Sequence, residues 1–192
     1  MATKIYIDQG HNPRNPNAGA EGNGLREQDL TYRIGIELAA LINENPNLTA
    51  RLSRPNENTQ LGTSNATSLR ARVDDANTWG ADYFISLHTN ASSIESASGS
   101  EGFVYALNTT ADRLSTAIIK NLTEATGLRN RGIFARPGLY VLRKTVMPAT
   151  LIELGFITNP SDAALMNENP ALFARGVYNG IIEFLRTTQA SL

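Results

Sequence analysis

The two histidines of this 192-residue chain both follow apolar, strand-like segments. His11 comes shortly after residues 4–8, and His88 comes directly after residues 83–87. In an open α/β sheet, ligands bind in the crevice beyond the carboxyl ends of the strands. We therefore expect the two imidazoles to share one site. Because imidazole is the commonest metal ligand among side chains, this site is a candidate metal centre.

Two glutamates complete the candidate site. A catalytic zinc ion commonly has three protein ligands plus a water, and two histidines with one glutamate form a known set. Glu27 is the best third ligand, because its helix should return along the sheet from the loop that carries His11 and because a carboxylate suits a first helical turn. Glu153 interrupts an apolar run, where a buried carboxylate is costly unless a cation lies nearby. We interpret Glu153 as the base that a metal-bound water needs.

Each of these residues also has an ordinary structural interpretation. A histidine at a strand end is often only hydrogen-bonded, and Glu27 can be a plain acid at a helix N-terminus. Glu153 can be the partner of a buried arginine, and Asp8 can simply orient the turn after its strand. Taken together, the residues leave metal binding and these structural roles about equally favoured.

The composition narrows the chemistry and the partners. The absence of cysteine excludes disulfides, thiolate nucleophiles and cysteine-rich zinc sites. The 17 basic residues nearly balance the 18 acidic ones and are spread along the chain, which disfavours nucleic acid as a partner. No apolar run approaches the roughly 20 residues that span a bilayer, so we expect no membrane insertion. The N-terminus does not have the pattern of a signal peptide.

Strand-like apolar runs alternate with segments of helical period. The first helix, for example, has Leu30, Ile34, Leu38 and Leu41 on one face. This alternation predicts an α/β domain with a largely parallel sheet covered by helices on both faces. We expect the polar loop 91–100 to border the site. The expected strands are 4–8, 48–54, 82–88, 101–107, 139–143 and 150–154, and the expected helices are 27–42, 68–79, 108–126, 162–167 and 171–187.

Five segments resemble, in order and with similar spacing, those of the zinc-dependent N-acetylmuramoyl-L-alanine amidases. This family cleaves peptidoglycan and is found in autolysins and phage endolysins. The resemblance extends from about residue 4 to residue 185. The segments are 5–11 (IYIDQGH), 24–27 (GLRE), 86–90 (SLHTN), 139–143 (LYVLR) and 147–159 (MPATLIELGFITN).

The resemblance implies a role for each candidate residue. His11, Glu27 and His88 would bind Zn²⁺, and Glu153 would serve as general base and then as general acid. Arg143 would be a cation on the substrate side. The implied fold is a single α/β domain with a twisted, mixed, mostly parallel sheet of about six strands flanked by helices. The implied reaction is hydrolysis of the amide between N-acetylmuramic acid and the L-alanine of the stem peptide.

Three residues depart from the family's usual pattern. Gln9 stands in place of a proline, Asn12 in place of a glycine and Tyr32 in place of an asparagine. None of them is a candidate ligand or the base, but they bear on the shape of the loop around His11. We therefore include Asn12 as a candidate substrate-binding residue.

Two other functions fit the same residues. A zinc carboxypeptidase that trims stem peptides would use the same ligands, with Arg143 or Arg136 holding a terminal carboxylate. A non-catalytic wall-binding module would keep the fold, but the full set of ligands and base argues against it.

The resemblance also implies where such a protein would act. Its partner would be peptidoglycan at the bacterial cell wall, and without a signal peptide it would be released by lysis or by holin-type export. We expect residues 1–187 to form the catalytic domain. We expect residues 188–192 to be a tail or the start of a linker to a C-terminal wall-binding domain that this chain does not contain.

Overall fold

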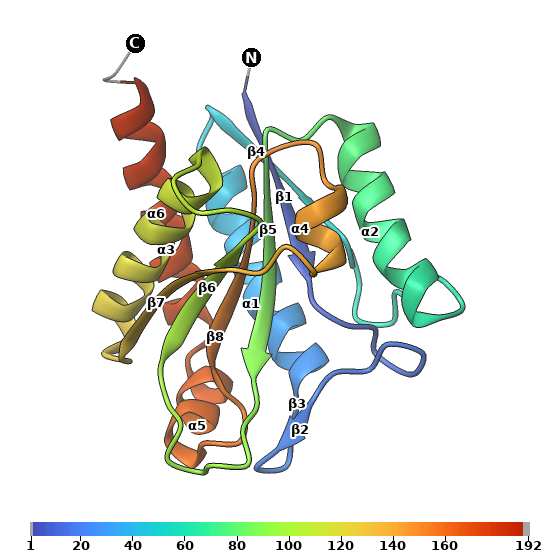
Figure 1. The fold of residues 1–192 in the computed structure, drawn as a ribbon, viewed down its shortest axis with the longest axis vertical. Helices are drawn as coiled ribbons and strands as arrows, with labels where there is room; N and C mark the ends of the chain where they lie inside the picture. Colours follow the sequence, from blue (N-terminus) through green and yellow to red (C-terminus); the bar gives the residue numbers. More distant parts are fainter. Residues whose placement is uncertain (1, 190–192) are drawn as a thin grey trace.

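The computed structural model describes residues 2–189 and has a six-stranded sheet at its centre (Figure 1). The strands are β1 (Thr3–Gln9), β4 (Leu48–Leu52), β5 (Tyr83–Asn90), β6 (Ser100–Val104), β7 (Asn130–Ala135) and β8 (Ala149–Phe156). Their order is β4-β1-β5-β8-β6-β7, and only the β8–β6 pair of this sheet is antiparallel. The predicted mixed, mostly parallel sheet is confirmed. Outside it, a short hairpin is formed by β2 (Glu21–Gly22) and β3 (Leu25–Arg26).

Helices cover both faces of this sheet, as predicted. They are α1 (Glu27–Asn43), α2 (Asn65–Trp79), α3 (Thr110–Thr126), α4 (Tyr140–Lys144), α5 (Pro160–Glu168) and α6 (Pro170–Gln189). The larger apolar core lies under α1, α3 and α6, and a smaller one lies under α2 and α4 on the other face (Figure 1). In α1, Leu30, Ile34 and Leu38 are buried, as their spacing predicts. No helix within residues 2–189 is long and apolar enough to cross a membrane.

The expected strand at 139–143 is wrong, because residues 140–143 belong to the helix α4 and Leu139 is its N-cap. Val141 and Leu142 are neighbours in sequence, yet both are buried against the smaller core. A strand would turn successive side chains to opposite faces, whereas one turn of helix buries both. A run of five residues is too short for its periodicity to distinguish the two.

Other differences concern the ends of helices and strands and one strand that the sequence did not predict. The structure adds β7, whose residues Asn130, Arg131 and Gly132 give no apolar alternation. α2 begins three residues before its expected start, because Ser64 and Thr67 cap it reciprocally. α6 continues to Gln189, so the expected tail at 188–192 starts within this helix, and residues 190–192 lie outside the described residues.

Candidate metal centre

Three of the predicted site residues meet at the carboxyl ends of β1 and β5. His11 lies in the loop after β1, Glu27 is the first residue of α1, and His88 lies near the end of β5. One ligand atom from each of the three lies within 4.8 Å of the other two. His11 Nε2 is 3.2 Å from Glu27 Oε2, and His88 Nδ1 is 2.9 Å from Glu27 Oε1. The structure thus brings together the ligand set that the sequence predicts.

The carboxylate of Glu27 is held by backbone as well as by imidazoles. Oε2 accepts a hydrogen bond from the Ala20 N–H at 2.9 Å, and Oε1 accepts one from the Thr89 N–H at 3.0 Å. Burial alone would raise the pKa of Glu27, but its hydrogen bonds with His11 and His88, and then their charges, outweigh burial and lower it. Glu27 is therefore a fixed anion between the two rings.

Two glycines make room for the ligands. A Cβ atom on Gly10 would lie 2.6 Å from the ring of His88, and one on Gly19 would lie 2.7 Å from Glu27 Oε2. Both distances are shorter than side-chain atoms tolerate. Any other residue at either position would displace a candidate ligand.

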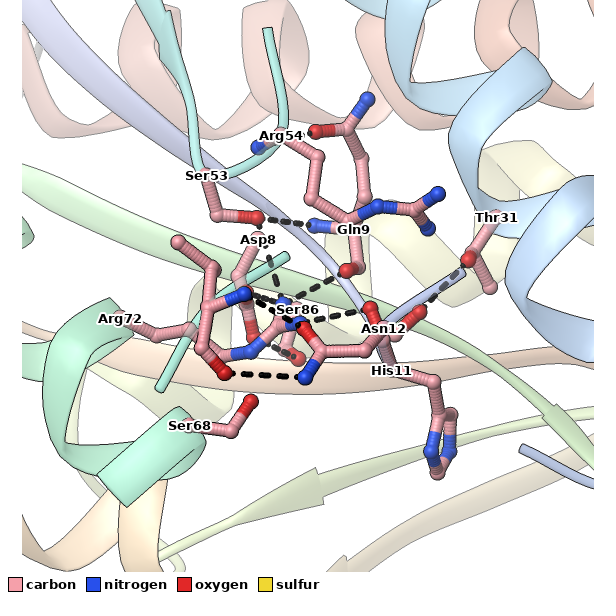
Figure 2. Close-up of polar contacts among 12 residues, drawn as sticks. Asp8, Gln9, His11, Asn12, Thr31, Ser53, Arg54, Ser68, Arg72 and Ser86 are labelled. Carbon is pink, nitrogen blue, oxygen red and sulfur yellow. Dashed lines mark hydrogen bonds and ion pairs between the residues drawn. The ribbon is translucent and has the colours of Figure 1, made fainter. Parts of the chain in front are cut away.

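The loop that carries His11 is fixed by a buried arginine (Figure 2). The backbone of His11 is in the left-handed region, with φ of 68°, and its carbonyl accepts a hydrogen bond from Arg72 Nη2 at 2.6 Å. Arg72 Nη1 donates to Asp8 Oδ1 and to the Gln9 carbonyl, both at 2.6 Å. Asp8 Oδ2 also accepts a hydrogen bond from Ser86 Oγ at 2.7 Å. Asp8 and Arg72 are thus a buried ion pair that orients the turn after β1.

The charge state of Asp8 follows from this pairing. Burial would raise its pKa, but the charge of Arg72 and the hydrogen bonds from Arg72 and Ser86 outweigh burial and lower it. Both members of the pair are only 1% exposed. Asp8 therefore stays charged beside the candidate metal centre.

Asn12 belongs to the same loop and is fully buried, with its side chain beside Arg72 (Figure 2). Its Nδ2 donates to the carbonyls of Pro16 and Leu61 at 2.8 and 2.9 Å, and its Oδ1 accepts from the Leu61 N–H at 3.1 Å. This geometry favours a role in shaping the loop. A direct contact between Asn12 and substrate stays a prediction.

The two other departures from the family pattern lie against each other. Gln9 Nε2 donates to the backbone carbonyl of Tyr32 at 3.3 Å, and Gln9 Oε1 accepts from the Arg54 N–H at 2.9 Å. The guanidinium of Arg54 lies 5.2 Å from the centre of the Tyr32 ring. Gln9 and Tyr32 therefore form one local arrangement behind the His11 loop.

Glu153 lies on β8, directly opposite His88 on β5 and opposite Glu101 on β6. Its Oε2 atom is buried and has no hydrogen-bond partner within the described part of the chain. Burial, followed by the charges of Glu27 and Glu101, raises the pKa of Glu153 to about 8. The structure therefore gives Glu153 no arginine partner, and its carboxyl group can hold a proton near neutral pH.

Glu101 is a neighbour of the site that the sequence did not single out. Its Oε1 accepts a hydrogen bond from Asn90 Nδ2 at 2.7 Å, and its Oε2 pairs with Arg131 Nε at 2.8 Å. The contact with Arg131 depends on β7, which the sequence pattern did not predict. Arg143 is exposed on α4, and its role toward substrate stays a prediction.

A cavity of about 120 Å³ opens beside the two histidines. Its polar lining comes from His11, His88, Asn17 and the Asp8–Arg72 pair. Its apolar lining comes from α2, β8 and the segment at the start of α4. The apolar lining residues are Leu69, Leu139, Tyr140, Val141 and Leu151.

The fold and the His-Glu-His cluster together define an α/β protein with a candidate metal centre at one end of its sheet. Residues 5–183 match the family model described as N-acetylmuramoyl-L-alanine amidase, so the chain belongs to that family. The amidase CwlM of Bacillus licheniformis is 35% identical over 182 residues, which cover 93% of this chain and 67% of that protein. The endolysin of Bacillus phage SPP1 is 30% identical over 200 residues, which cover 100% of this chain and 69% of that protein.

A solved structure gives the same fold. It is the catalytic domain of CwlV, an N-acetylmuramoyl-L-alanine amidase from Bacillus (Paenibacillus) polymyxa var. colistinus. Its TM-score to this chain is 0.84 at 28% identity, and the match covers 96% of this chain and 98% of that one. The predicted family and fold class are therefore confirmed.

Proposed function

We propose that this protein is a Zn²⁺-dependent hydrolase of peptidoglycan. It cleaves the amide between N-acetylmuramic acid and the L-alanine of the stem peptide at the bacterial cell wall. The observation that carries the proposal is the cluster of His11, Glu27 and His88, with Glu153 on the neighbouring strand, in a chain of the amidase family.

The donor set and its geometry support zinc at this position. Donor atoms bound to one tetrahedral zinc ion at about 2.0–2.2 Å lie roughly 3.3–3.6 Å apart. His11 Nε2 and His88 Nδ1 lie 3.2 and 2.9 Å from different oxygens of Glu27, and one ligand atom from each of the three residues lies within 4.8 Å of the other two, so this set could hold the ion between them. Zinc bound there would polarise the scissile carbonyl and lower the pKa of a bound water to about 7.

Glu153 moves the proton in this proposal. Its carboxylate takes a proton from the attacking water while the water oxygen bonds to the carbonyl carbon. It then delivers the proton to the L-alanine nitrogen as the carbon–nitrogen bond breaks. The products are a lactyl carboxylate and a free α-amine. Glu153 suits this step because it lies directly opposite His88 across β5 and β8, and its buried Oε2 has no hydrogen-bond partner within the described residues.

The test is digestion of purified cell walls with and without a chelator, followed by mass analysis of the fragments. We expect every cut to create one lactyl carboxylate and one free L-alanine amino terminus. The chelator should stop the digestion, and added Zn²⁺ should restore it. Release of single amino acids from the peptide ends would instead indicate a carboxypeptidase and contradict the proposal.

A further inference from the structure

The sheet beside Glu153 continues into an aromatic surface on the same face. Glu101 pairs with Glu153 across β6 and β8, and Phe103 is two residues further along β6. Because side chains alternate along a strand, Phe103 and Glu101 share a face. Phe134 on β7 is the cross-strand neighbour of Phe103, and the centres of the two rings are 6.4 Å apart. Phe134 is 41% exposed, which is high for a phenylalanine.

Arg136 is stacked on these two rings. It follows β7, where its backbone N–H donates to the Val104 carbonyl at 2.8 Å, and the chain then crosses the front of the sheet to α4 (Figure 1). Its guanidinium carbon lies 5.1 Å from the centre of the Phe103 ring and 5.9 Å from that of Phe134. Aromatic rings hold a guanidinium in one orientation and so reduce the entropy that it loses on binding a ligand.

The N–H groups of this guanidinium have no partner among the described residues. Within residues 2–189, the side chain of Arg136 makes no ion pair and no hydrogen bond. Arg72 and Arg131, by contrast, already donate to Asp8 and Glu101. Arg136 is therefore an oriented cation without an ion-pair partner among the described residues. It lies over Phe103, on the face of the sheet that also carries Glu153.

We propose that Arg136, held by Phe103 and Phe134, binds the terminal carboxylate of the peptide arm of the substrate. A planar guanidinium binds a carboxylate through two parallel hydrogen bonds, and every peptide has at least its terminal carboxylate. Phe103 is on the strand next to that of Glu153, which separates them by about 5 Å across the sheet. It is also two residues further along, which adds about 7 Å in the strand direction. The guanidinium therefore lies on the order of 10 Å from the scissile bond, which an extended peptide of about three residues spans.

We call Arg136 with Phe103 and Phe134 the carboxylate clamp. This clamp rests on the proposed function, so its test measures binding separately from cleavage. The probes are an N-acetylmuramoyl tripeptide that ends in a carboxylate and the same compound ending in a carboxamide. Their dissociation constants are measured with the Glu153→Gln protein, in which the proposed base is absent. We expect the carboxylate form to bind about two- to fivefold more tightly, the range of an exposed ion pair.

Matched variants locate the effect. Adding Arg136→Ala to the Glu153→Gln protein should make the two compounds bind equally. Adding Phe134→Ala instead should reduce the difference between their dissociation constants, although the charge of Arg136 is kept. Arg175→Ala is the control, because Arg175 is also exposed and stacked on a ring, 5.9 Å from the centre of Tyr178, but lies on α6 across the sheet. Thermal unfolding should be the same for the Arg136 and Arg175 variants.

The outcomes separate the clamp from the reaction. The clamp would be overturned if the Glu153→Gln protein showed no preference for the carboxylate compound. It would also be overturned if adding Arg136→Ala left that preference unchanged. If the preference depends on Arg136 but wild-type protein with zinc leaves the muramoyl amide intact, the clamp stands and the proposed reaction fails.

Discussion

The buried carboxyl groups on the two sides of the candidate metal centre differ in their charge state. On the His11 side, Asp8 pairs with Arg72 at 2.6 Å, and the pKa of Asp8 is lowered. On the β8 side, Glu153 has a buried oxygen without a hydrogen-bond partner among the described residues, and its pKa is raised to about 8. A carboxyl group is thus a fixed anion on one side, and on the other side it is the group that carries the proton in the proposed function.

This difference predicts which residues near the site matter for stability and which matter for activity. Arg72 donates to Asp8, to the Gln9 carbonyl and to the His11 carbonyl, so its loss leaves several buried groups without partners. The buried oxygen of Glu153 has no such bond to lose. Substitutions on the His11 side should therefore reduce stability, whereas substitution of Glu153 should reduce activity and leave the fold intact.

The largest effect should follow from Glu153→Ala. Positioned acid–base groups contribute roughly 10²–10⁴-fold to a rate, so we expect turnover of cell walls to fall by about that factor. Zinc content per chain should be unchanged, because Glu153 is not among the three clustered ligands. Atomic absorption together with a wall-clearing assay would check both. A variant that clears walls at nearly the wild-type rate would show that the base is another group.

The next largest effect should come from Arg72→Ala. Removing one member of a buried pair leaves the other charge uncompensated and typically costs about 3–5 kcal/mol. Urea unfolding of chelator-treated protein would measure this cost without any contribution from metal. The control is Arg51→Ala, which breaks the exposed pair of Arg51 with Asp75 and should cost less than about 1 kcal/mol. Equal losses in the two variants would contradict the contrast between the two sides.

A third prediction uses pH, again in chelator-treated protein. The unfolded chain releases the proton of a glutamate near pH 4.3, whereas the folded protein holds that of Glu153 to about pH 8. The folded state therefore binds more protons in this interval, and stability should decline as the pH rises through it, by a few kcal/mol. Glu153→Gln should remove this decline. Urea unfolding of both proteins from pH 4 to pH 8 would check it, and curves that stay parallel would refute it.

The sequence predicts the centre of the site because that part depends on local patterns. His11 and His88 follow the apolar runs of β1 and β5, and neighbouring parallel strands bring their carboxyl ends to one edge of the sheet. Glu27 opens α1, and Glu153 interrupts the apolar run of β8. Each signal can be seen within a few residues of sequence.

The surroundings of the site could not be predicted in this way. Arg72 binds the His11 loop from a helix far along the chain, and nothing in its local sequence identifies Asp8 as its partner. Arg136 stacks on Phe103 only because β7 pairs with β6, and β7 lacks an apolar alternation. These contacts are set by tertiary structure, which a local pattern does not contain.

The smallest effect tests the packing behind the His11 loop. Arg54 is buried, its Nε atom has no hydrogen-bond partner within the described residues, and its guanidinium faces the Tyr32 ring. Burial, followed by the charge of Arg72, lowers the pKa of Arg54 to about 10, so the ring offsets part of an unfavourable environment. Tyr32→Asn, which introduces the residue usual in the family, should lower the free energy of unfolding by about 1 kcal/mol without changing zinc content. Tyr32→Phe keeps the ring and should behave like wild type. A change in turnover without a change in stability would show that the His11 side takes part in the chemistry. The contrast between a stabilising His11 side and a catalytic β8 side would then be wrong.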